Sequence, residues 1–105
     1  MSEKVYRVFM STPLGKKYGT LATNIAGSDL SGHLDILAHS EPFEGTIDSK
    51  GNCAISGVFT TLMRRVPYKA TGTLSDCSVH LMMQGERRTY ELSGNRISEK
   101  EETDL

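Results

Sequence analysis

The chain has 105 residues, enough for one domain that buries about 60–65% of its unfolded surface, so it needs no disulfide framework or metal to fold. Twelve basic and thirteen acidic residues give a net charge of −1, without the basic excess typical of nucleic-acid-binding modules. No apolar run resembles a membrane span or a signal peptide. We therefore expect no nucleic-acid partner, no membrane partner and no cofactor.

The glycines recur at an almost even spacing, with steps of 13, 13, 12, 15 and 13 residues. This spacing fits one short strand plus one turn, so it predicts a β-meander along the whole chain. The glycines concerned are Gly19, Gly32, Gly45, Gly57, Gly72 and Gly85.

The first predicted strand covers residues 5–10, with Tyr6, Val8 and Met10 on one face. Residues 12–15 contain proline and glycine and break this strand. We expect the basic pair that follows to lie in the loop, before a second strand over residues 20–26. That pair is Lys16 and Lys17.

The third strand is expected over residues 32–38, after a turn at 26–29, and residues 39–42 are expected to close it. A fourth strand presents Phe43, Gly45 and Ile47 on its apolar face. The next segment, Asp48-Ser49-Lys50-Gly51, carries the firmest local signal, because Asp at the start and Gly at the end favour a tight turn.

The returning arm of this hairpin alternates apolar residues over 53–59. Residues 62–65 fit either a strand or a short helical turn. Pro67 cannot occupy a central, fully hydrogen-bonded position of a sheet ladder. The last strands are expected at 68–74, 79–83 and 90–92, the final two joined by a turn at 84–86.

The C-terminal residues 98–105 form an acidic tail beyond a single β-barrel-like domain at 1–97. Ser98 and Glu101 have capping-box spacing, but the tail has no apolar face. We expect a short helix or a frayed end.

Gly45, Gly57 and Gly72 share a predicted face with the large apolar residues of their strands. Glycine inside a strand marks a bend or a close approach, and its repetition lets a sheet coil and close. The prediction is an all-β antiparallel meander of about eight short strands, rolled into a small up-and-down barrel or half-barrel. The alternative is an open sheet that packs its glycine-lined face on a second copy.

In its succession of hairpins and its strand glycines, the chain resembles small calycin-like or lipocalin-like meander barrels. The resemblance concerns architecture, and it implies no functional residues. It leaves open whether the interior is hollow or filled.

A candidate acid–base site consists of His33 and Asp35, two residues apart on one strand face, with His80 or Glu44 nearby. The competing interpretation is an ordinary solvated face, since the outer face of a strand is normally polar. The histidines and cysteines show no metal-binding spacing.

Aromatic and methionine side chains on separate strands are candidates for lining a ligand cavity, although the same residues suit a filled core. These candidates are Tyr6, Met10, Phe43, Phe59, Tyr68, Met83 and Tyr90.

Cys53 and Cys77 lie 24 residues apart and have no CxxC partner. We interpret them as reduced thiols of a cytoplasmic protein, with a single disulfide as the alternative. The remaining basic cluster is interpreted as solvated strand ends rather than a nucleic-acid interface. It comprises Arg64, Arg65, Lys69, Arg87 and Arg88.

Taken together, these patterns favour a non-enzymatic small β-barrel module that binds a small apolar ligand or a protein partner, as a homodimer. The alternative is a small barrel enzyme that uses His33 and Asp35 for acid–base chemistry.

Overall fold

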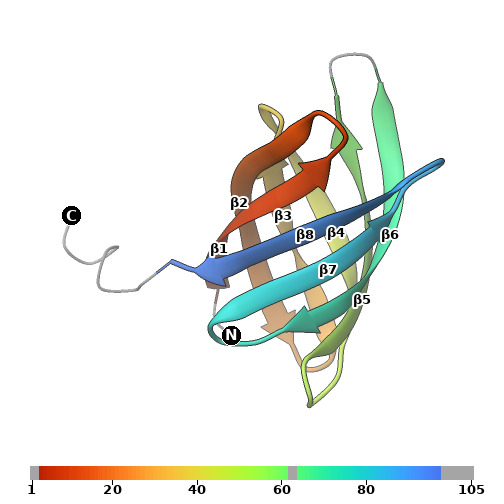
Figure 1. The fold of residues 1–105 in the computed structure, drawn as a ribbon. Helices are drawn as coiled ribbons and strands as arrows, with labels where there is room; N and C mark the ends of the chain where they lie inside the picture. Colours follow the sequence, from red (N-terminus) through yellow and green to blue (C-terminus); the bar gives the residue numbers. More distant parts are fainter. Residues whose placement is uncertain (1–2, 62–63, 98–105) are drawn as a thin grey trace.

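The computed structural model describes residues 3–61 and 64–97, and these form a closed, antiparallel β-barrel (Figure 1). The strands follow one another around the barrel in chain order, and β1 pairs with β8 to close it. They are β1 (Glu3–Thr12), β2 (Gly15–Ala26), β3 (Asp29–Ile36), β4 (His39–Ile47), β5 (Asn52–Thr60), β6 (Arg65–Leu74), β7 (Ser78–Gln84) and β8 (Thr89–Arg96). The predicted all-β meander is confirmed, and it closes fully. The tail at 98–105 lies outside the described residues.

Each strand alternates between the barrel interior and the surface, as the period of two in the sequence requires. In β7, for example, Val79, Leu81 and Met83 are buried, whereas the residues between them are exposed. All eight strands contribute buried hydrophobic side chains to one cluster. Burying each large apolar side chain contributes about 1.5–3 kcal/mol to folding. Within the described segments there is no helix that is long and apolar enough to cross a membrane.

Glycines on the inner face allow neighbouring strands to approach closely where the sheet coils. A Cβ at any of these five glycines would collide with a carbonyl oxygen of an adjacent strand: Gly19, Gly32, Gly45, Gly72 and Gly94. The expectation for Gly45 and Gly72 is therefore confirmed. Gly85 departs from the pattern because it lies in the β7–β8 turn, and Gly94 supplies the glycine of β8 instead.

Two inner glycines are covered by aromatic rings from the neighbouring strand. A Cβ on Gly32 would lie 3.0 Å from Cζ of Phe43, and a Cβ on Gly57 would lie 2.9 Å from the hydroxyl of Tyr68. Both pairs are direct cross-strand partners. Each ring therefore fills the space that its glycine leaves empty.

The prediction that Lys16 and Lys17 lie in a loop is wrong, because β2 begins at Gly15. Both lysines pair with β1, Lys16 with Ser11 and Lys17 with Met10. The two-residue connection of β1 to β2 is much shorter than the sequence indicated. As a result, Lys16 lies on the outer face of the sheet.

The third strand ends at Ile36, two residues before its predicted end. Leu37 and Ala38 form a two-residue turn with φ of 57° and 67°, and β4 begins directly at His39. Such turns normally contain Asn, Asp or Gly, which tolerate positive φ. Because Leu and Ala carry no such signal, the prediction placed the turn at 39–42 and was wrong.

The predicted turn at Asp48 is confirmed. The Asp48 carboxylate accepts hydrogen bonds from the backbone N–H groups of Lys50 (2.8 Å) and Asn52 (2.9 Å), and Gly51 adopts a φ of 90°. Hydrogen bonds from the side chain and the backbone of Asn52 lower the pKa of Asp48. This turn sets the register of β4 against β5.

Candidate functional site

The sheet ladder is incomplete on both sides of the β5–β6 hairpin. Pairing of β4 with β5 stops at Phe43 and Gly57, and pairing of β6 with β7 stops at Lys69 and Gln84. β5 and β6 remain paired with each other to the ends of both strands. The outer half of this hairpin therefore leaves the barrel wall, with a gap on each side.

A proline stands at the edge of each gap. Pro42 pairs with His33 of β3 but has no partner on β5, and Pro67 pairs with Val58 of β5 but has none on β7. Proline has no N–H to donate, so it suits a position whose outward side is unpaired. The expectation that Pro67 avoids a fully bonded ladder position is confirmed.

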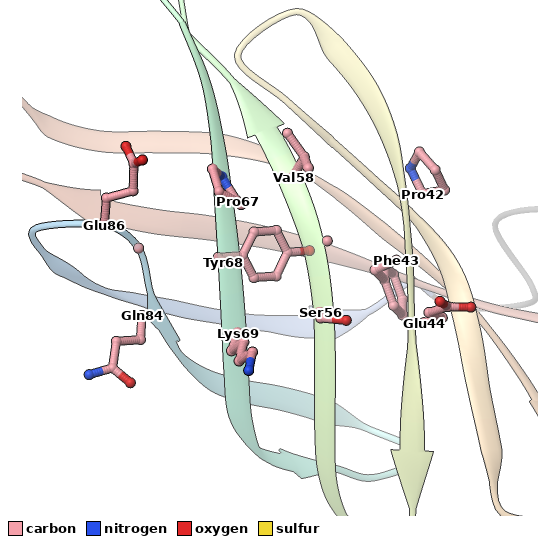
Figure 2. A pocket seen from close by; sticks show the side chains of 12 residues that line it. Pro42, Phe43, Glu44, Ser56, Val58, Pro67, Tyr68, Lys69, Gln84 and Glu86 are labelled. Atoms are coloured by element: carbon pink, nitrogen blue, oxygen red, sulfur yellow. The ribbon is translucent and has the colours of Figure 1, made fainter.

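The hairpin and its neighbours enclose an open pocket of about 810 Å³, which is within the usual size range of small-molecule sites. Figure 2 shows the Tyr68 ring extending from β6 towards β5, with Pro67 and Val58 on one side and Ser56 and Lys69 on the other. The lining residues are Pro42, Phe43, Glu44, Ser56, Gly57, Val58, Pro67, Tyr68, Lys69, Gln84, Gly85 and Glu86.

Tyr68 is the chemically informative residue of this pocket. Its side chain is only 4% exposed, and its hydroxyl has no hydrogen-bond partner among the residues that the structure describes. Because no buried side-chain oxygen or nitrogen of these residues lacks a partner, the hydroxyl is the part of Tyr68 that meets solvent in the pocket. Tyr6, the other tyrosine in the core, donates its hydroxyl proton to the carbonyl oxygen of Ser75 at 2.6 Å. A tyrosine with a buried ring and a hydroxyl open to a pocket offers one polar group to whatever occupies that pocket.

Burial raises the pKa of Tyr68 to about 12. The phenol therefore remains neutral at physiological pH and keeps its proton. In this state the hydroxyl can donate a hydrogen bond to an acceptor in the pocket. Gly57 makes this position possible, because a side chain there would contact the hydroxyl.

The outer half of the hairpin is linked to β4 and to the β7–β8 turn by side-chain contacts and not by backbone ladder hydrogen bonds. Thr60 Oγ1 donates to Glu41 Oε2 at 2.6 Å, and an Arg65 guanidinium nitrogen lies 3.6 Å from the other oxygen of Glu41. On the opposite side, Arg64 forms an ion pair with Glu86 of the β7–β8 turn. Exposed ion pairs of this kind contribute at most about 1 kcal/mol each.

The candidate acid–base residues do not converge. His33 and Asp35 lie exposed on the outer face of β3, where Asp35 accepts a hydrogen bond from Thr20 Oγ1 at 3.3 Å. His80 lies on β7, which is on the opposite side of the eight-stranded ring, and its Nε2 is 2.6 Å from Glu91 Oε2. Only Glu44, on β4, lines the pocket.

The candidate ligand-lining residues point into the barrel, where most of them form its core. All except Tyr90 are buried, and Tyr90 is partly buried and packs against them. Phe59 makes an edge contact with Tyr90, with ring centroids 5.4 Å apart. Only Phe43 and Tyr68 also line the pocket.

Cys53 is buried and Cys77 is exposed, and both are free thiols. Burial raises the pKa of Cys53. Among residues 3–61 and 64–97, no group of three or more His, Cys, Asp and Glu side chains could hold a metal ion.

Comparison of the chain with models of protein families, with curated proteins and with solved structures found no match.

The pocket is not evident from the sequence, because it depends on where the ladders between neighbouring strands stop. One signal was present: Pro67 was recognised as incompatible with a continuous ladder. Pro42 carries the same signal, but the sequence pattern predicts a turn at residues 39–42, whereas Pro42 lies within β4. One proline in the strand beside the hairpin (Pro42 in β4) and one within the hairpin (Pro67 in β6) indicate that the hairpin separates from its neighbours.

Proposed function

We propose that this protein is a non-enzymatic β-barrel module that binds a small, largely apolar ligand in the pocket beside the β5–β6 hairpin. The observation that carries the proposal is the Tyr68 hydroxyl, which sits on a buried ring, has no partner among the described residues and opens into a pocket of ligand size. The barrel interior, by contrast, holds the core side chains.

The pocket chemistry restricts the ligand. Pro42, Val58 and Pro67 offer apolar contact, and Tyr68 offers one hydrogen-bond donor. Charges of both signs lie at the rim, so the pocket has no strong preference for an ion. The expected ligand is a neutral molecule with an apolar body and one carbonyl or ether oxygen that accepts a hydrogen bond from the Tyr68 hydroxyl.

The proposal is tested by measuring thermal stabilisation of the protein against a library of neutral apolar carbonyl compounds. A ligand at a hundred times its dissociation constant adds about 2.7 kcal/mol to the free energy of unfolding. Tyr68→Phe keeps the ring but removes the donor, and it should weaken binding by about 2- to 10-fold, as the loss of one hydrogen bond predicts.

Tyr6→Phe is the matched control, since it removes a hydroxyl that is bonded to Ser75 and does not line the pocket. This variant should lower the stability of the fold by about 1 kcal/mol or more and leave ligand affinity unchanged. The proposal fails if no compound stabilises the protein. It also fails if a bound compound has equal affinity for the wild type and for Tyr68→Phe.

A further inference from the structure

A second surface with distinctive chemistry lies on the outer face of the β1–β2 hairpin. Phe9 of β1 and Tyr18 of β2 are direct cross-strand partners, with ring centroids 6.0 Å apart and ring planes inclined by 49°. The Tyr18 side chain is 69% exposed. One tyrosine ring is therefore available to solvent and is supported from the side by a second aromatic ring.

Cations flank the two rings along the strands. The Lys16 ammonium lies 4.6 Å from the centroid of the Phe9 ring, a cation–π contact. Arg7 is exposed on the same face, two residues from Phe9 on the side away from the turn. Since alternate residues of a strand are about 6.7 Å apart, the backbone positions of Arg7 and Lys16 lie about 13 Å apart along the hairpin, and the Lys16 side chain reaches back over Phe9. This set of Arg7, Phe9, Lys16 and Tyr18 is called the β1–β2 platform below.

A shallow pocket of about 400 Å³ continues from the platform across β8. Among residues 3–61 and 64–97 its lining contains no acidic side chain and consists of Arg7, Val8, Phe9, Tyr18, Gly94, Asn95, Arg96 and Ile97. Three acidic residues lie on the neighbouring strands β3 and β8: Asp29, Asp35 and Glu91. Asp35 accepts a hydrogen bond from the Thr20 hydroxyl and lines a separate pocket with Tyr18, and Glu91 contacts His80. The four residues of the platform itself include two cations and no acidic side chain, although the chain has a net charge of −1.

We propose that the β1–β2 platform binds single-stranded nucleic acid, with a base stacked on Tyr18 and the flanking phosphates held by Lys16 and Arg7. Aromatic rings beside cations on a sheet surface are the standard means of holding unpaired bases, because every base has a face that can stack. The charge complementarity favours a polyanion, and the exposed ring favours one that carries flat bases.

This site differs from the basic cluster considered from the sequence. Two members of that cluster, Arg64 and Arg65, form ion pairs with Glu86 and Glu41. The sequence does not predict the platform, because its pattern places Lys16 in a loop, whereas in the structure Lys16 belongs to β2 and lies over Phe9. A small net charge limits long-range attraction but does not prevent a local contact with a few phosphates.

The experiment measures fluorescence anisotropy of labelled eight-nucleotide dT and rU strands at several salt concentrations. Binding should weaken as salt increases, with a slope of log K against log [salt] of about −1.4, for two phosphates at about 0.7 each. Lys16→Ala and Arg7→Ala should each reduce the magnitude of this slope by about half. Lys50→Ala, in the β4–β5 turn, is the matched control and should change nothing.

Tyr18→Ala should weaken binding by about tenfold, whereas Tyr18→Phe should retain it, because stacking needs the ring and not the hydroxyl. Tyr18 is exposed, so an unchanged melting temperature would show that these variants remain folded. Polyphosphate and polyglutamate serve as polyanions without bases.

The proposal is overturned if the oligonucleotides do not bind at low salt, or if Tyr18→Ala binds as well as the wild type. It is equally overturned if polyphosphate or polyglutamate competes as strongly as the oligonucleotide at equal charge, since the site would then recognise charge alone. Binding that depends on the Tyr18 ring and is resisted by these competitors supports it.

Discussion

At the scale of single residues, the most unusual backbone lies in the β3–β4 turn. Leu37 and Ala38 both have positive φ, a conformation that costs a residue with a Cβ about 1–2 kcal/mol. A two-residue turn with positive φ at both positions has a backbone twist that matches the right-handed twist of the adjoining strands, which explains why the chain adopts this conformation here. Leu37 is also partly buried against the core, so packing offsets part of its strain.

Ala38→Gly should raise the free energy of unfolding by about 0.5–1 kcal/mol. Glycine removes the strain at positive φ, and this gain exceeds its greater loss of backbone entropy. Chemical denaturation measures the change. Ala54→Gly, within the regular strand β5, is the control and should destabilise by about the same amount. Equal destabilisation by both substitutions would contradict this account of the turn.

At the scale of strands, the inner glycines determine how tightly the sheet coils. Gly72 of β6 lies opposite Leu81 of β7, and a Cβ there would collide with the carbonyl oxygen of His80. Backbone cannot move aside as a flexible side chain can, so β6 and β7 would have to separate. The closeness of these strands therefore depends on the absence of a Cβ.

Gly72→Ala should lower the free energy of unfolding by about 2 kcal/mol or more, because the added methyl group forces two strands apart. Gly85→Ala is the control: its Cβ would make an ordinary contact of 3.4 Å with Val66, and we expect a change below about 1 kcal/mol. Urea denaturation of both variants provides the comparison. Similar stability of the two variants would show that close strand approach at Gly72 is unimportant.

The strand order and the inner face were predictable because both depend on local patterns. Alternation placed Tyr6, Val8 and Met10 inside, and in-strand glycines indicated curvature. The β3–β4 turn was not predictable, since Leu37 and Ala38 lack the residue types that mark positive φ. The pocket was not predictable because it depends on where two ladders end, which reflects the global twist of the barrel.

At the scale of the whole molecule, ionisation of buried tyrosine links stability to pH. The folded-state pKa of Tyr68 is about 12, compared with about 10 in an unfolded chain, because burial disfavours the phenolate. Below the unfolded-state pKa the group is protonated in both states, and the fold keeps its full stability. As the pH rises from the unfolded-state pKa to the folded-state pKa, the unfolded chain loses its proton more readily, and the free energy of unfolding falls. The barrel should therefore lose stability between about pH 10 and pH 12.

Tyr68→Phe should retain about 2–3 kcal/mol more of its stability across this interval than the wild type, since a shift of two pKa units corresponds to about 2.7 kcal/mol. Urea denaturation at pH 8 and at pH 12 measures the difference, and Tyr18→Phe, at an exposed position, is the control. If Tyr68→Phe loses as much stability as the wild type, Tyr68 does not ionise on unfolding in this range.

The junction of β1 and β8 has a consequence for the order of folding. Every other ladder joins strands that follow each other in the chain and can form early by local zippering, whereas this junction brings residues 6–11 against 91–96. It is therefore the step with the longest chain closure. Until it forms, the molecule is an open sheet in which β1 and β8 are unpaired edge strands, each able to form backbone hydrogen bonds with another chain. A substitution that weakens this junction should promote aggregation during refolding more than an equally destabilising one elsewhere.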